Sequence, residues 1–216
     1  NISGASVASV GTLTITDVGT AAFSGTIGAT TVAITDAVTS VTFNAAVTAT
    51  TLTVPIGSGG YAVSLLGTGD AITNAVTFAN TGALTLGQAG GTQTYTGGLT
   101  ATANSSRTIN GTINTTDTAI NLGAVTLGSN ATLDTNAATT AGDLTIGAVT
   151  GATFNLSLDT GHVLGADING TSVSGVGTFT ITDVDTATFT GTIGATTVTI
   201  TDERILVDLQ AAITAA

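Results

Sequence analysis

A short alternating phrase constrains the fold of this chain more than any other feature. Thr12-Leu13-Thr14-Ile15-Thr16 places two apolar side chains on one face of an extended segment and three threonines on the other. Such β-branched residues favour strands over helices. Similar phrases recur about every ten residues as far as Val198-Thr199-Ile200, with small or turn-forming residues between them. The pattern predicts an all-β chain of many short strands.

The repetition of this phrase favours a β-solenoid (β-helix), in which successive coils stack on one another. The inward residues are mostly Val, Leu, Ile and Ala, which suits a narrow core, and small residues crowd the expected corners. With roughly 20 residues per coil, we expect about ten coils and a rod on the order of 50 Å long. A β-sandwich remains the alternative fold, although a sandwich of the immunoglobulin type normally has a large core aromatic residue.

One long segment occurs twice. Ser6–Asp36 and Ser172–Asp202 align without a gap, and their differences keep the alternation of apolar and polar residues. Because the copies lie near opposite ends, we interpret them as two mating surfaces of an assembly that grows head to tail. The candidate interface residues are the apolar members of both copies and of the following segment: Leu13, Ile15, Phe23, Val32, Ile34, Phe179, Ile181, Phe189, Val198, Ile200, Ile205, Leu206, Leu209 and Ile213.

The period changes after Asp202. Apolar residues at Ile205, Leu206, Leu209 and Ile213 follow helical spacing, and acidic residues lie where the first turn would be. The sequence therefore predicts a β-strand-repeat domain over 1–201 and a C-terminal helix over 202–216. A helix this short needs a surface to pack against. It would either cap the end of the solenoid or contact a neighbouring subunit.

Composition excludes several function classes. The 216 residues include only two Lys and Arg together against 13 acidic residues, a net charge of −11. Nucleic-acid binding requires clustered basic residues, so we expect no nucleic-acid partner. No apolar run is long enough to cross a bilayer, so we expect no membrane insertion. The absence of cysteine excludes disulfides and thiolate metal sites.

Few residues are candidates for chemistry. Asp159-Thr160-Gly161 matches the signature of aspartic proteases, but these residues also form turns readily, and a turn is our expectation. His162 is the only histidine, so we expect a structural role and no histidine-based zinc site. Asp183 and Asp185 are the candidates for a structural calcium site, with solvated corner acids as the simpler interpretation. We expect no enzyme and no other cofactor.

The phrases 41–54 and Gly82-Ala83-Leu84-Thr85-Leu86-Gly87 resemble the β-strand repeats of large bacterial surface proteins, namely autotransporter passengers and filamentous-haemagglutinin-type adhesins. The resemblance covers most of 11–202 and lies in composition and phrase style. It implies a β-solenoid stalk, export to the cell surface, and a role in adhesion or surface architecture. The helix expected after Asp202 departs from it and favours a self-contained subunit.

We therefore expect a non-enzymatic extracellular protein, either a self-assembling subunit of a surface filament, sheath or matrix, or an adhesin stalk. Its main partner would be a second copy of itself, with a surface glycan or cell-surface molecule as a further possibility. An ice- or glycan-binding module is the alternative, because Thr-x-Thr pairs are frequent. A glycan site would have only Tyr61 and Tyr95 as aromatic platforms outside the phenylalanines.

Overall fold

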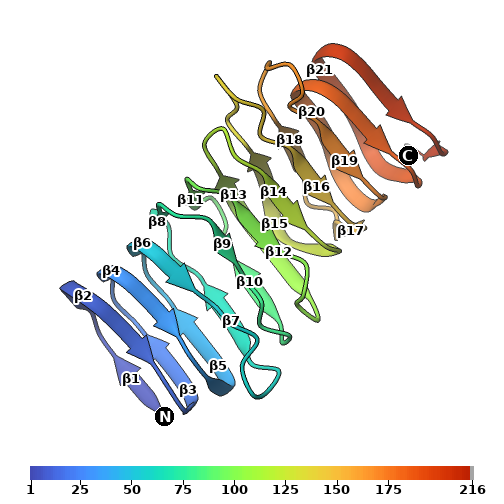
Figure 1. Ribbon diagram of the computed structural model, residues 1–216. Helices are drawn as coiled ribbons and strands as arrows, with labels where there is room; N and C mark the ends of the chain where they lie inside the picture. Colours follow the sequence, from blue (N-terminus) through green and yellow to red (C-terminus); the bar gives the residue numbers. More distant parts are fainter. Residues whose placement is uncertain (215–216) are drawn as a thin grey trace.

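The computed structural model describes residues 1–214, apart from the side chain of Glu203. The chain forms a parallel β-solenoid of about 11 turns, with the termini at opposite ends of the stack (Figure 1). The strands are β1 (Ile2–Gly4), β2 (Val7–Ile15), β3 (Val18–Phe23), β4 (Ile27–Ile34), β5 (Ala37–Phe43), β6 (Val47–Thr53), β7 (Ala62–Leu65), β8 (Asp70–Ile72), β9 (Val76–Thr77), β10 (Leu84–Leu86), β11 (Thr92–Tyr95), β12 (Leu99–Ala101), β13 (Arg107–Asn114), β14 (Ile120–Leu122), β15 (Val125–Asp134), β16 (Leu144–Ile146), β17 (Val149–Thr150), β18 (Leu156–Asp159), β19 (Ile168–Gly170), β20 (Val173–Phe189), β21 (Ile193–Leu209) and β22 (Ile213–Thr214).

Each coil contributes segments to three columns. In the second coil, residues 21–23 lie in column A, 27–29 in column B and 32–34 in column C. Each segment pairs in parallel with its equivalent one coil earlier and one coil later, so that Val41 lies between Ala21 and Val63 in column A. The stacked-coil prediction is therefore confirmed. The spacing between parallel strands, about 4.8 Å, gives about 11 turns a length of roughly 50 Å.

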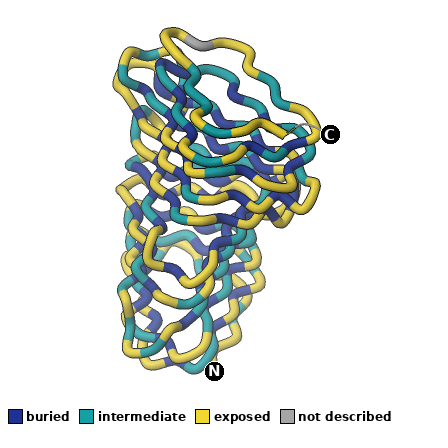
Figure 2. Tube along the Cα trace, turned by 90° about the vertical axis from the view of Figure 1, so that its right-hand side faces the viewer, coloured by how far each residue is buried: buried dark blue, intermediate teal, exposed yellow. Residues whose placement is uncertain are grey.

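The inward side chains of the three columns form one continuous core that runs along the solenoid. Alternate residues of the strands are buried, as the alternating phrases predict, and buried and less buried positions alternate along the trace in Figure 2. Aromatic residues fill the core where coils allow it. Phe23 stacks on Phe43 in the next coil with ring centroids 5.4 Å apart, and Phe78 meets the edge of Tyr95 at 6.3 Å.

Coil length varies while the register in the columns is kept. Strand residues that pair between adjacent coils are separated in sequence by 18 residues for Thr108 and Thr126 and by 25 residues for Ala131 and Leu156. The extra residues lie in the corners. The loop that begins at Pro55 is one such corner, in agreement with the turn chemistry of Pro and Gly.

The predicted C-terminal helix is wrong. No residue among 1–214 is helical, and the segment after Asp202 continues strand β21 and then forms β22. Strand β21 pairs with β20 through Leu206 opposite Thr186 and Leu209 opposite Phe189. Packing on a preformed parallel edge satisfies the backbone of this segment, and it outweighs the intrinsic helical periodicity of so short a stretch. Residues 215–216 of the expected helix lie outside the described residues.

The structure extends the duplication beyond its most obvious part. Strand β19 (Ile168-Asn169-Gly170) occupies in the second copy the place that Ile2-Ser3-Gly4 has in the first, and Ala211-Ala212-Ile213-Thr214 corresponds to Ala45-Ala46-Val47-Thr48. The pairing registers agree as well. Ile27 pairs with Val7 and Val47, and its equivalent Ile193 pairs with Val173 and Ile213. Thus residues 167–214 repeat the structure of residues 1–48.

Even an irregularity is copied between the two segments. The register shifts between Val7 and Val10 in the first copy and between Val173 and Val176 in the second. Ser9 and Gly175, which lie at the equivalent position inside this shift, both have a left-handed backbone, with φ of 57° and 63°. The copies therefore share backbone conformation as well as sequence pattern.

Candidate functional site

The C-terminal end of the solenoid carries a cluster of exposed apolar side chains. The exposed fraction is 40% for Ile200, 62% for Ile205 and 50% for both Leu206 and Ile213. A hollow of about 470 Å³ lies among Ile200, Ile205, Leu206 and Val207. We call Ile200, Ile205, Leu206, Val207 and Ile213 the C-terminal edge. Large exposed apolar side chains that gather at one place are typical of an interaction surface.

In the first copy of the duplication, the residues equivalent to the C-terminal edge are covered by a following coil. Ile34, Val41 and Val47 correspond to Ile200, Val207 and Ile213, and each has an exposed fraction of 0%. They are buried because the next coil, which runs from Leu52 to Ile72, stacks on them. The C-terminal edge is therefore an interior coil surface without a following coil in this structure.

The N-terminal end is open in the same way. Ile2 is 40% exposed, whereas its equivalent Ile168 is fully buried between Leu144 and Ala187. Val7 and Leu13 are only partly buried, whereas their equivalents Val173 and Phe179 are fully buried. We call Ile2, Val7 and Leu13 the N-terminal edge. Both edges also offer strand backbone groups that pair on one side only.

The predicted interface residues divide between the core and the two edges. Most of them pack the interior of the chain itself, so only the remainder can contact a neighbour without a change in the fold. The buried residues are Ile15, Phe23, Val32, Ile34, Phe179, Ile181 and Phe189; Leu13, Val198 and Leu209 are partly buried; and Ile200, Ile205, Leu206 and Ile213 are exposed.

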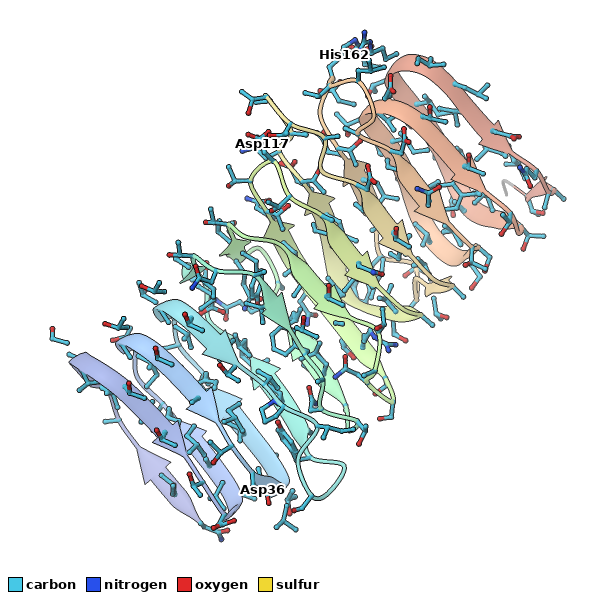
Figure 3. All side chains as sticks on the ribbon, viewed as in Figure 1. Asp36, Asp117 and His162 are labelled. Carbon is cyan, nitrogen blue, oxygen red and sulfur yellow. The ribbon has the colours of Figure 1, made fainter. Side chains whose placement is uncertain are left out.

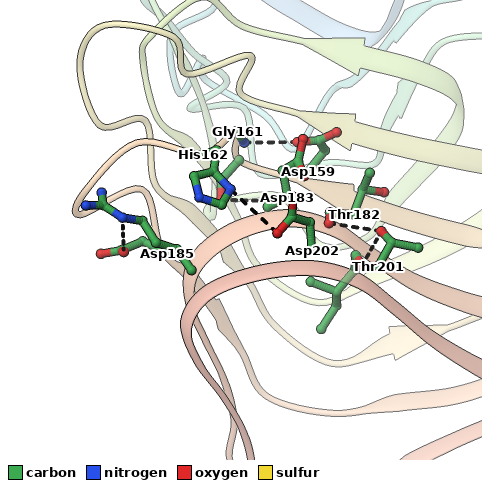
Figure 4. Close-up of polar contacts among 11 residues, drawn as sticks. Asp159, Gly161, His162, Thr182, Asp183, Asp185, Thr201 and Asp202 are labelled. Atoms are coloured by element: carbon green, nitrogen blue, oxygen red, sulfur yellow. Dashed lines mark hydrogen bonds and ion pairs between the residues drawn. The ribbon is translucent and has the colours of Figure 1, made fainter.

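A group of three potential metal ligands lies near the C-terminal end. Ligand atoms of His162, Asp183 and Asp202 lie within 4.8 Å of one another, and His162 Nδ1 is 3.7 Å from Asp202 (Figure 4). Asp183 and Asp202 meet because they end the same phrase in consecutive coils, a signal that the sequence contains. His162 lies on a corner loop, and no periodic pattern in the sequence predicts where that loop places it. The group offers fewer ligands than calcium normally takes.

The predicted pair Asp183 and Asp185 does not form one site. A register shift between Val184 and Thr186 turns Asp185 away from Asp183. The side chain of Asp185 is buried, accepts a hydrogen bond of 2.8 Å from the backbone of Gly165, and lies 3.9 Å from Arg204 Nε (Figure 4). Two residues that alternate along a strand share a face only where the strand is regular.

Asp159-Thr160-Gly161 forms a turn. The backbone N–H of Gly161 donates to the Asp159 carboxylate at 2.9 Å, and Gly161 has a φ of 73°, which suits glycine. The Thr160 hydroxyl is buried and donates to the Ala166 carbonyl at 2.9 Å. Burial raises the pKa of Asp159, and the nearby carboxylates of Asp134 and Asp183 add to that effect.

Asp70 and Arg107 are two of several buried polar groups that interrupt the apolar core. Asp70 points inward in column B, where it accepts hydrogen bonds from the backbone of Val47 and from Gln93 Nε2, and burial raises its pKa to about 6. Arg107 points inward in column A and donates to the carbonyls of Ala101, Thr102, Asn104 and Ala124. Burial lowers the pKa of Arg107. These groups tie corners to the core and do not face solvent.

Hydroxyl side chains form long columns on the outer surface, interrupted in column A by Ala22. The uneven spacing of these residues in the sequence gave no sign of the columns. Variation in coil length is absorbed at the corners, so residues at irregular spacing still stack in register. Column A carries Ser3, Ala22, Thr42, Ser64, Thr85, Thr108, Thr126, Thr150 and Ser174 on its outer face. Column B carries Thr92, Thr112, Thr132, Ser157, Thr180 and Thr199.

Side chains cover the outside of the rod along its whole length (Figure 3). The outer face of column B has a shallow hollow of about 550 Å³ near the N-terminus, lined by small uncharged residues such as Ser9, Gly28 and Thr50. Neither aromatic platform considered for glycans is available, because Tyr61 and Tyr95 are both fully buried.

No protein-family model, curated protein or solved structure matches the chain. No helix among the described residues is long and apolar enough to cross a membrane.

Proposed function

We propose that this protein is a non-enzymatic structural rod of an extracellular surface assembly, and that its two open edges join it to further copies. The observation that carries the proposal is the parallel ladder, because coils pair with their neighbours in one direction and residues 167–214 repeat the pairing registers of residues 1–48. Ile200 and Ile213 at one end and Ile2 at the other are exposed, while the equivalent residues inside the solenoid are fully buried. The coils all run in the same direction, so a second copy in the same orientation would continue the parallel ladder.

Composition and fold support this role. The buried apolar side chains form one core cluster that runs from Ile15 to Ala195. The resemblance to the strand repeats of bacterial surface proteins supports the extracellular location and the part in a filament, sheath, matrix or adhesin stalk. Contact through the ends is heterologous, because the C-terminal end of one copy meets the N-terminal end of the next. A heterologous contact that does not close into a ring produces a filament.

The test is whether the protein associates end to end. We expect sedimentation velocity and negative-stain microscopy to detect rods longer than one molecule, in amounts that rise with concentration. The double substitution Ile200→Asp with Ile213→Asp places charges on the C-terminal edge and should leave single rods. Val38→Asp is the matched control, because Val38 is 66% exposed in the second coil, away from that edge. Single rods at all concentrations, or equal effects of the two variants, would refute end-to-end assembly.

The hydroxyl columns favour a second candidate function, the binding of an ordered surface such as ice. Column A presents exposed or half-buried Ser and Thr residues over nine consecutive coils, with Ala22 as the one non-hydroxyl member. Parallel stacking spaces them by about 4.8 Å. Thermal hysteresis measurements test this candidate. Thr126→Lys should abolish any activity, and an inactive wild-type protein at high concentration would remove the candidate.

A further inference from the structure

Three potential metal ligands converge on one outer corner of the solenoid. His162 lies on the corner loop between β18 and β19, Asp183 lies on β20 and Asp202 lies on β21. Ligand atoms of all three lie within 4.8 Å of one another (Figure 4). We propose that these residues form a binding site for a divalent transition-metal ion, with zinc as the expected occupant. The site requires no contact between the ends of two rods.

The fold brings the three ligands from three successive coils. Asp183 and Asp202 are partners in the parallel register of β20 and β21. The corner loop belongs to the coil before Asp183, yet it places His162 Nδ1 3.7 Å from Asp202 Oδ1. A bound ion would therefore join three coils at one corner of the rod.

The two carboxylates repel each other, and a bound cation would relieve that repulsion. Like charges opposite each other on neighbouring strands destabilise the pairing. Neither Asp183 nor Asp202 forms an ion pair with an arginine among the described residues, because Arg107 donates to backbone carbonyls in the core and Arg204 lies 3.9 Å from Asp185. A divalent ion between the two carboxylates would replace their repulsion by attraction.

The two earlier coils add negative charge at the same corner. Asp134 and Asp159 end strands β15 and β18 and are partners in the parallel register. Burial raises the pKa of both groups, and the charge of Asp183 contributes to the rise. Carboxylates that stack in this way produce a negative potential, which attracts a cation to the corner.

The ligand set selects the kind of ion. Calcium takes about six to eight oxygen ligands, whereas zinc binds imidazole nitrogen and carboxylate oxygen and can complete its shell with water. The lone His162 suffices, because the two carboxylates supply the other protein ligands. Ligand atoms around a tetrahedral zinc ion lie roughly 3.4 Å apart. The side chains of His162 and Asp202 are 50% and 58% exposed, so they have the freedom to close to that spacing.

The duplication contains a natural comparison for this site. Asp17 and Asp36 occupy in the first copy the places that Asp183 and Asp202 occupy in the second. The first copy has the pair of acids without an imidazole, because His162 is the only histidine and lies before the repeated segment. We therefore expect no zinc site of this kind at the first pair.

The test titrates the full chain, prepared without a histidine tag, with zinc chloride. His162 is the only histidine, so the imidazole signals in the NMR spectrum report on this site alone. We expect these signals to shift and to saturate at a single equivalent of zinc. Isothermal titration calorimetry measures the affinity, and His162→Gln and Asp202→Asn should each weaken zinc binding by at least about 10-fold.

Asp17→Asn is the matched control. It removes the carboxylate equivalent to that of Asp183, so it should leave the zinc affinity unchanged, whereas Asp183→Asn should lower it. Hydrogen exchange gives a second readout. Zinc should slow exchange in residues 161–165 of the wild type and of Asp17→Asn, but not of His162→Gln, because the ion ties this loop to the two strands.

Three outcomes would overturn the proposal. The first is a set of imidazole signals that does not respond to zinc. The second is an equal zinc affinity in the wild type and His162→Gln, which would place the ion on the acidic surface at large. The third is tighter binding of calcium chloride than of zinc chloride, because the ion would then be held by oxygen ligands alone.

Discussion

At the scale of single residues, Asp70 makes the stability of the rod depend on pH. Its folded-state pKa of about 6 lies above the unfolded value, because burial disfavours the charged carboxylate. The folded state therefore binds a proton more tightly than the unfolded state does. Stability should increase as pH falls through 6, and this contribution should be flat below the unfolded pKa.

We expect the free energy of unfolding to rise by about 1.5 kcal/mol between pH 7.5 and pH 5 on account of Asp70. Urea denaturation at the two pH values measures this change. Asp70→Asn should remove most of it. Asp117→Asn is the control, because the exposed Asp117 carboxylate accepts hydrogen bonds from 138–140 that hold its pKa below the usual range. That variant should leave the pH slope unchanged, and a loss of slope in it would contradict the assignment to Asp70.

Arg107 stabilises a corner through its shape as well as its charge. Its guanidinium donates to four backbone carbonyls, among them those of Asn104 at 2.9 Å and Ala124 at 3.1 Å. Arg107→Met leaves these acceptors without their donor inside the fold and should lower the free energy of unfolding by roughly 3 kcal/mol. Arg107→Lys keeps the positive charge but lacks the several N–H donors of the planar guanidinium. It should therefore recover only part of the lost free energy of unfolding. Full recovery in urea denaturation would show that charge alone suffices.

At the scale of strands and corners, glycine sets how closely coils approach. A Cβ added at Gly82 would overlap the carbonyl oxygens of Tyr61 and Gly60. Backbone atoms of a neighbouring coil cannot rotate away, so Gly82→Ala should cost about 2 kcal/mol. Gly11→Ala is the control, because a Cβ there meets nothing within 4 Å. Thermal unfolding compares the two, and equal melting temperatures would contradict this account.

Alternation predicted the strands and the stacking of coils, since each inward Val, Leu or Ile must be buried on one face. It did not predict that the segment after Asp202 forms strands. Ile205, Leu206 and Leu209 fit the spacing of a helix as well as an edge strand, and local periodicity cannot decide between the two. The deciding signal was longer in range, in the match of Ala211-Ala212-Ile213 to Ala45-Ala46-Val47.

The candidate edges were only partly predictable for a related reason. Sequence pattern indicates which residues are apolar, but it does not indicate whether a coil lies above them. Val32 and Val198 occupy the same place in the two copies, yet Val32 is fully buried and Val198 only partly. The difference comes from the neighbouring coil. The meeting of His162 with Asp202 likewise depends on a corner loop whose conformation has no periodic signal.

At the scale of the whole molecule, each coil contacts only the coils before and after it, so stability should vary along the rod. Ile113 and Ile193 are both fully buried, but Ile113 lies in the middle and Ile193 in the penultimate coil. Ile193→Ala should speed hydrogen exchange in the last coils only. Ile113→Ala should do so across many coils on both sides. Uniform acceleration by both variants would instead indicate a single cooperative unit.

The duplication with identical register has a consequence for how such a rod could change over generations. Recombination between the stretches of DNA that encode the two copies would exchange segments at equivalent strands, and each junction would resemble one that already folds. Ile2 lies in column A, whereas its equivalent Ile168 lies in column C. The product would therefore gain or lose whole strands in a fixed step, and the strands after the junction would move to a different column of the rod.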